Sequence, residues 1–294
     1  MSNATAIPII TADGSENTLT LYRSDGEAQA PVVLCMPAMG VAADYYQPLA
    51  EALCAAGLHA ATADLRGIGA SSVRASRKVN FGYEEMLEQE WPELINCLRQ
   101  QCPDSPIYLM GHSLGGQLNT LFLAENSEQV AGMILIAACS IHYKGYARPL
   151  RLLLATQFLS FLSQLLGYLP GKKLGFGGRE ARQLIKEWAH CARTGNYKLK
   201  RRGTSLEEKL TAVTLPVLAI SFEEDWMAPR QAVVKLYDKL AAAEITHQHL
   251  SGDALGIAHL NHFNWARDPS VLVARIDNWI RSVSLPPRRV NQSE

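Results

Sequence analysis

Short runs of apolar residues alternate with longer amphipathic segments along most of the chain. The apolar runs predict buried strands at residues 31–36, 58–63, 107–110, 130–137, 215–221 and 244–250. The segments between them predict helices at residues 44–56, 83–101, 117–124, 230–241 and 270–283. This order is typical of an α/β fold, in which a mostly parallel central sheet carries helices on both faces.

The alternation is interrupted at residues 141–205. We interpret this stretch as an inserted helical cap, which divides the core into residues 1–140 and 206–294. Within it, residues 150–169 are rich in leucine, but five polar residues gather on one side of the helical wheel. A spanning helix does not need such a side, so we predict an amphipathic helix packed over the core and no transmembrane segment. Contact with a lipid surface is the alternative.

Composition and charge narrow the classes of partner. With 28 Lys and Arg against 28 Asp and Glu, the net charge is zero, which argues against a nucleic-acid partner. The six cysteines are scattered and form no C-x-x-C pair, so we interpret them as reduced, mostly packed thiols. Residues 1–10 lack an export signal, and we therefore expect a cytoplasmic location. We predict no cofactor and no metal.

A nucleophile motif lies between a predicted strand and a predicted helix. Residues 111–115 read G-H-S-L-G, a G-x-S-x-G sequence. A tight turn there strains the backbone at Ser113, so small residues two positions away, Gly111 and Gly115, are needed to avoid clashes. Such an elbow lifts the serine hydroxyl above the sheet and places the Leu114 N–H where it can donate to an oxyanion. A chance match is the alternative, which the strand–helix context disfavours.

A serine hydroxyl needs a histidine as base and a carboxylate to orient it, in the chain order serine, acid, histidine. We interpret His112 as a packing residue, because its side chain should point away from the hydroxyl. The loop after the predicted strand at 215–221 offers Asp225 as the orienting acid. Glu223 and Glu224 are alternatives, although successive acids in a loop are often solvated surface.

Two histidines follow the predicted strand at 244–250. We favour His262 as the base, because it lies nearest the last predicted helix and aromatic residues follow it closely. His259 remains the alternative base. The two histidines inside the strand itself are interpreted as structural.

Two further loops follow predicted strands. The loop P-A-M-G at residues 37–40 should supply the second oxyanion donor, and we expect this donor to be the Met39 N–H. Residues 64–72, D-L-R-G-I-G-A-S-S, are assigned no catalytic role, and their interpretation as a flexible turn stays open.

Together these motifs resemble the α/β-hydrolase superfamily over nearly the whole chain. The stretches at residues 36–48, 166–175 and 262–267 are similar to a bacterial group of predicted α/β hydrolases whose catalytic loop ends in an H-F-G-F-F-R-like sequence. This match falls on His262. The resemblance implies the α/β-hydrolase fold, a catalytic triad and a serine esterase reaction. Most superfamily members have His-Gly where this chain has Pro37-Ala38, which makes Met39 a less secure donor than Leu114.

The leading functional hypothesis is therefore hydrolysis of an ester, thioester or related acyl bond through an acyl-enzyme. The leucine-rich cap suggests a small acyl substrate that is apolar. One alternative is a non-enzymatic ligand-binding protein on the same scaffold, because fold does not fix function. Another is transfer of the acyl group to an acceptor other than water. The sequence does not indicate the oligomeric state or the physiological substrate.

Overall fold

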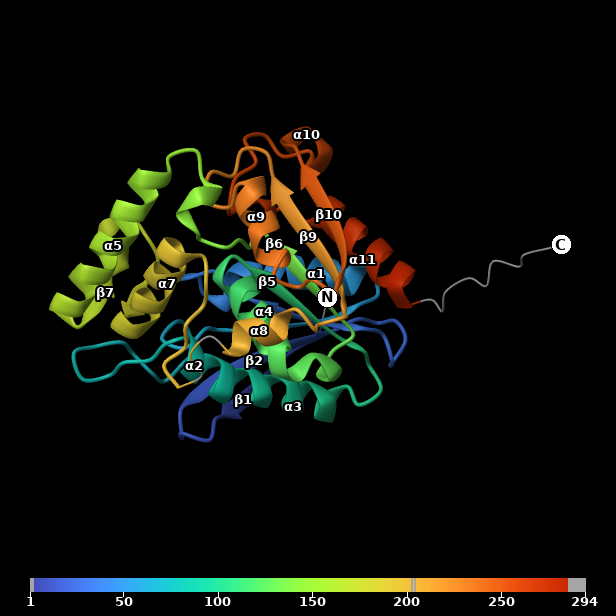
Figure 1. Cartoon of the computed structure of the whole chain (residues 1–294). Coiled ribbons are helices and arrows are strands. Elements are labelled where there is room, and N and C mark those ends of the chain that lie inside the picture. The colour runs from blue at the N-terminus through green and yellow to red at the C-terminus, as the bar shows by residue number, and fades with distance from the viewer. Residues whose placement is uncertain (1–2, 202, 204, 285–294) are drawn as a thin grey trace.

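An eight-stranded sheet forms the centre of the molecule, with helices on both faces (Figure 1). The computed structural model describes residues 3–201, 203 and 205–284. The strand order is β1-β2-β4-β3-β5-β6-β9-β10. All neighbours from β4 to β10 are parallel, whereas β1 pairs antiparallel with β2 and β2 antiparallel with β4. The predicted α/β-hydrolase architecture, a mostly parallel sheet between helices, is confirmed.

The predicted central strands are present and deeply buried. The strands β3, β4, β5 and β6 expose no residue, which is expected where helices cover both faces and explains their continuous apolar runs. The sheet consists of β1 (Asn3–Ile10), β2 (Glu16–Arg23), β3 (Val32–Met36), β4 (His59–Ala63), β5 (Ile107–His112), β6 (Gly132–Ile136), β9 (Pro216–Phe222) and β10 (Glu244–Leu250).

The hairpin β1–β2 at the edge of the sheet was not predicted. Its strand β2 buries alternate side chains, among them Leu19 and Leu21, and carries polar residues between them. An antiparallel strand that is covered on one face has no continuous apolar run, so a search for such runs misses it.

Helices cover the two faces of the sheet. On one face α1 contacts α11, and on the other α3 and α4 both contact the π-helical turn η2 (Figure 1). The predicted helix at 83–101 consists of three consecutive segments, α2, η2 and α3. The core helices are η1 (Ala43–Tyr46), α1 (Gln47–Ala55), α2 (Tyr83–Glu85), η2 (Met86–Glu90), α3 (Trp91–Gln101), α4 (Leu114–Asn126), η3 (Ser127–Gln129), α9 (Arg230–Tyr237), α10 (Gly252–Leu255), η5 (Asn264–Ala266) and α11 (Ser270–Ser284).

The chain between β6 and β9 adds no strand to the main sheet. Most of it lies to one side of the sheet, where α5 packs on α7 (Figure 1), and its last helix α8 returns to contact α4. Its elements are η4 (Tyr143–Gly145), α5 (Pro149–Leu166), β7 (Tyr168–Pro170), α6 (Gly171–Leu174), β8 (Arg179–Ala181), α7 (Arg182–Thr194) and α8 (Ser205–Leu210).

The helix α5 packs on α7 with its polar side, a feature that the sequence did not indicate. Its buried side chains are the polar residues Thr156 and Ser163, and its largest apolar side chains point outward. The Gln157 Nε2 donates to the Ala189 carbonyl at 2.8 Å, which ties the polar side to α7. Of the leucines, Leu152 and Leu159 are half-buried and pack against the core, so the predicted packing of this helix over the core involves only part of its apolar side chains. Helical periodicity identifies two faces, but it does not show which of them the neighbouring helix covers.

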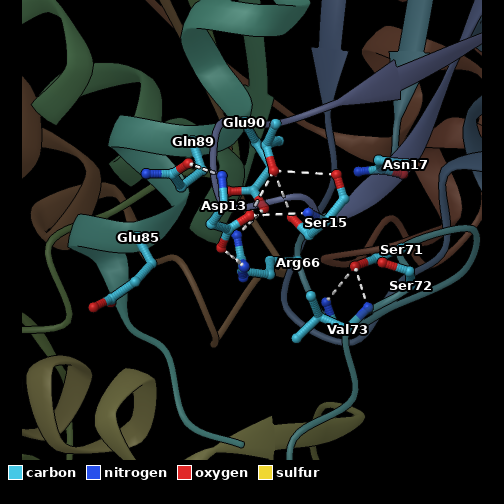
Figure 2. Close-up of polar contacts among 12 residues, drawn as sticks. Asp13, Ser15, Asn17, Arg66, Ser71, Ser72, Val73, Glu85, Gln89 and Glu90 are labelled. Atoms are coloured by element: carbon cyan, nitrogen blue, oxygen red, sulfur yellow. Dashed lines mark hydrogen bonds and ion pairs between the residues drawn. The ribbon is translucent and has the colours of Figure 1, made fainter.

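Residues 64–72 form a closely bonded loop rather than a flexible turn. The two carboxylate oxygens of Asp64 accept hydrogen bonds at 2.8 Å from the amides of Ala43 and Ala70. Arg66 is buried and forms an ion pair with Glu90 at 2.7 Å and a second with Asp13 (Figure 2). The loop therefore joins the N-terminal hairpin to the helix that contains Glu90.

All six cysteines are buried and free, as predicted from their scatter. Burial raises the pKa of Cys54 to about 11 and that of Cys139 to about 12, so both thiols stay protonated near neutral pH.

Candidate active site

The strand β5 ends at His112 and α4 begins at Leu114, so Ser113 alone forms the turn between them. Its backbone has φ 52° and ψ −113°, an unusual conformation for a residue with a side chain. A Cβ added at Gly111 would lie 2.3 Å from the Gly116 nitrogen, and one at Gly115 would lie 2.3 Å from the Met36 carbonyl oxygen. The small residues that the elbow hypothesis requires are thus imposed by close backbone contacts.

Asp225 and His262 lie in direct contact. Asp225 follows β9, and its Oδ2 lies 2.7 Å from His262 Nδ1. The other carboxylate oxygen accepts hydrogen bonds from the backbone amides of Met227 and Ala228 at 2.9 and 3.0 Å. Both side chains are almost completely buried, at 0% and 4% exposure. The two backbone amides fix the position of the carboxylate, and its other oxygen holds the His262 imidazole.

The alternative acid and base residues lie in solvent. Glu223 and Glu224 are exposed, which fits the solvated surface considered for them. His259 is exposed and has a positive φ of 53°, and its carbonyl accepts a hydrogen bond from the Asn264 side chain. Among the described residues, the only histidine bonded to Asp225 is His262.

Sheet topology explains why distant parts of the chain meet at this site. The strands β5, β9 and β10 are parallel, so the segments that follow them emerge at the same edge. Ser113 follows β5, Asp225 follows β9, and His262 lies beyond β10. The rings of His112 and His262 are 4.8 Å apart, which brings the elbow and the histidine loop into contact.

Two backbone amides, one on each of the loops at the elbow and after β3, have no hydrogen-bond acceptor among the residues that the structure describes. Leu114 is the first residue of α4, and the N–H groups of a first helical turn have no carbonyl within the helix. In the loop after β3, the Ala38 amide donates to the Tyr46 hydroxyl and the Val41 amide donates to the Ala38 carbonyl. Within the described part of the chain, the Met39 amide has no such acceptor.

Tyr46 also belongs to this site, although it was not predicted from the sequence. Its hydroxyl lies 2.7 Å from His112 Nδ1 and also accepts the hydrogen bond from Ala38. His112 is completely buried, and this burial, followed by the nearby His262, holds its pKa well below the ordinary value. His112 is thus buried in the elbow, as predicted, but it also has a polar role. Through the Tyr46 hydroxyl it connects the elbow to the loop after β3. Tyr46 lies within the family-like stretch 36–48, which was the available signal.

Glu180 is a buried carboxyl next to the same loop. One of its oxygens accepts a hydrogen bond from the Gly178 amide at 2.7 Å, and burial raises its pKa to about 7. Gly178 packs against Gly40, where an added Cβ would lie 2.2 Å from the Gly178 nitrogen. The segment around β8 thus contacts the loop that carries Met39.

We expect Glu180→Gln to flatten the pH dependence of stability. The carboxyl pKa rises from 4.5 to about 7 on folding, so the folded chain keeps a proton that the unfolded chain releases in this window. The contribution of Glu180 to stability therefore falls as pH rises from 4.5 to 7. Glutamine keeps an oxygen that can accept from Gly178. The variant should gain up to about 3 kcal/mol relative to wild type between about pH 5 and about pH 8, measured by urea unfolding. An equal difference at both pH values would contradict this expectation.

Among the described residues, no group of three His, Cys, Asp or Glu side chains is placed to hold a metal ion.

The mostly parallel sheet, with a strand–serine–helix turn followed in the chain by a paired acid and histidine, defines an α/β hydrolase. The family model described as serine aminopeptidase, S33, matches residues 27–253. The chain therefore belongs to the S33 serine aminopeptidase family of α/β hydrolases.

Two relatives share less than a quarter of their aligned residues with this chain. Mouse (Mus musculus) monoglyceride lipase is 22% identical over 193 residues, which are 63% of this chain and 62% of the lipase. The match thus spans less than two thirds of that enzyme. The putative carbamate hydrolase RutD of Variovorax paradoxus is 23% identical over 255 residues, covering 83% of this chain and 92% of RutD.

Solved structures agree on the fold. A thermostable carboxyl esterase from Bacillus coagulans, in complex with glycerol, has a TM-score of 0.68 at 15% identity, with 95% of this chain and 98% of the esterase covered. DcsB in complex with a substrate analogue has a TM-score of 0.65 at 17% identity, with 95% and 99% covered. At these identities the likeness establishes the fold alone.

Proposed function

We propose that the chain is a serine hydrolase that cleaves an ester, thioester or related acyl bond through an acyl-enzyme on Ser113. The observation that carries this proposal is the buried Asp225–His262 pair, whose histidine ring packs against the ring of His112 next to the elbow. The carboxyl esterase and monoglyceride lipase to which the chain is similar support ester substrates.

In this mechanism, Asp225 holds His262 Nδ1, so that Nε2 of the ring is the nitrogen available to accept the Ser113 proton. The serine oxygen attacks the acyl carbonyl, and the amides of Leu114 and Met39 donate to the oxyanion that forms. The protonated His262 then gives its proton to the leaving alcohol or thiol. A water molecule, deprotonated by His262, hydrolyses the acyl-enzyme and regenerates Ser113.

The residues around the Asp225–His262 pair favour an apolar acyl substrate. Trp226 and Phe263 follow Asp225 and His262 directly in the chain, and both expose large apolar surface, Trp226 at 75%. We propose that residues 141–205 act as a cap over the site, since α5 and α7, which belong to this stretch, lie to one side of the sheet (Figure 1). Large apolar side chains at a site favour apolar ligands.

A fluorophosphonate probe tests the nucleophile. We expect the purified chain to be labelled on the peptide that contains Ser113, and Ser113→Ala to remain unlabelled, because the probe reacts only with an activated hydroxyl. Peptide mass spectrometry identifies the labelled residue. The same preparation, assayed on p-nitrophenyl esters of increasing chain length, should prefer acyl groups longer than acetyl.

Labelling of Ser113→Ala at another residue would refute the assignment of the nucleophile. A folded wild-type chain that stays unlabelled and binds an acyl compound tightly would favour a non-enzymatic binding protein. Release of the acyl group only when an acceptor other than water is added would indicate acyl transfer.

A further inference from the structure

An apolar stripe runs along the outer face of α5. It consists of Leu150, Leu154, Phe158, Phe161 and Leu165, which are 61–69% exposed. Their spacing of three or four residues places them on one side of the helix. The helix has a mean hydropathy of 1.2, and only 11% of it is buried. Large apolar side chains grouped in this way mark an interaction surface.

The opposite face of α5 is already used by the fold. Besides Gln157, the Gln164 Nε2 donates to the Arg182 carbonyl at 3.0 Å, and Arg77 Nε donates to the Leu166 carbonyl at 3.2 Å. These bonds hold the helix along its length against the rest of the chain. A helix attached in this way lies on a membrane surface more readily than it crosses the membrane, since crossing would break all of these contacts.

The charge of the surrounding sequence has a single sign. No Asp or Glu occurs at residues 129–179, and this stretch contains Lys144, Arg148, Arg151, Lys172, Lys173 and Arg179. Leu174, which is 46% exposed, directly follows two of these lysines in the chain. An apolar stripe in a basic segment is complementary to a bilayer that contains anionic lipid.

The same charges disfavour a second copy of the chain on this surface. A two-fold dimer brings identical surfaces together, so it would place one cation-rich segment against another. The same cations would instead be attracted to the negative charge of an anionic bilayer. We propose that the outer face of α5 docks on the surface of a bilayer that contains anionic phospholipid, with the helix lying in the interface.

Vesicle binding tests this proposal independently of catalysis. The probes are liposomes of phosphatidylcholine with about one third phosphatidylglycerol, and liposomes of phosphatidylcholine alone. We expect wild type and Ser113→Ala to float equally with the anionic liposomes, less with the neutral ones, and less in high salt. The triple variant Leu154→Ser/Phe158→Ser/Phe161→Ser should lower the partition coefficient by roughly 100-fold, because it removes three apolar side chains from the interface.

The matched control is Ile10→Ser, which removes a side chain that is 65% exposed on β1, the edge strand of the main sheet and an element separate from α5 (Figure 1). It should bind like wild type. Equal binding of the triple variant and wild type, or no binding of wild type to anionic liposomes, would overturn the proposal. Sedimentation that shows a wild-type dimer without lipid, and a monomeric triple variant, would assign the surface to a second copy instead.

Discussion

His262→Ala is expected to lower kcat for ester hydrolysis by about 10⁴-fold or more, whereas His259→Ala should stay within about twofold of wild type. The reason is that Asp225 Oδ2 lies 2.7 Å from His262 Nδ1. His259, in contrast, is exposed to solvent and has a backbone φ that is positive. Without His262, no group would accept the Ser113 proton, and an un-ionised hydroxyl is a poor nucleophile.

The measurement is steady-state kinetics on a p-nitrophenyl ester, with circular dichroism to show that each variant is folded. Asp225→Asn adds a second comparison, because the amide leaves the packing in place but favours the wrong imidazole tautomer. Its loss of kcat should approach that of His262→Ala. If His259→Ala lost activity and His262→Ala kept it, the base would be His259 and the buried pair would have a structural role.

Arg66→Met is expected to lower the free energy of unfolding by about 3 to 5 kcal/mol. The guanidinium is buried between Glu90 and Asp13, and only Asp13 reaches solvent (Figure 2). Burial already raises the pKa of Glu90 to about 7. Without the Arg66 guanidinium, the Glu90 carboxyl must either stay protonated or carry an unpaired buried charge, and both destabilise the folded chain at this pH. Urea unfolding at about pH 8 measures the loss.

Two controls accompany this variant. Arg281→Met removes an exposed arginine whose partner Asp277 lies one helical turn away, and it should leave the free energy of unfolding close to that of wild type. The double variant Arg66→Met/Glu90→Gln should recover part of the loss, because it removes the unpaired acid together with its cation. An Arg66→Met chain as stable as Arg281→Met would show that the cluster does not support the fold.

The central sheet could be predicted from the sequence because its strands are covered on both faces. Such strands need apolar residues at every position, as at β3 and β6, and the resulting runs are visible without coordinates. The edge hairpin β1–β2 and the outward turn of α5 were not visible in this way. Both depend on what lies against one face of an element, and periodicity alone does not give that.

The candidate serine, acid and histidine could be predicted because an α/β hydrolase places them in a fixed order along the chain. A strained serine between strand and helix, an acid after β9 and a histidine after β10 follow from the topology of parallel strands. The interaction of Tyr46 with His112, and the burial of Glu180 next to the Met39 loop, were not predicted. These contacts join segments that are distant in the sequence, and no local pattern marks them.

The buried ring of His112 lies next to His262 and affects the charge balance of the proposed mechanism. In the proposed mechanism the His262 ring becomes a cation during each acyl transfer, and another charged ring at a centroid distance of 4.8 Å would oppose this strongly. Because burial keeps His112 neutral, the transient positive charge meets only the carboxylate on its other side. The elbow thus keeps an imidazole as a spacer that can carry a hydrogen bond but does not compete for the proton.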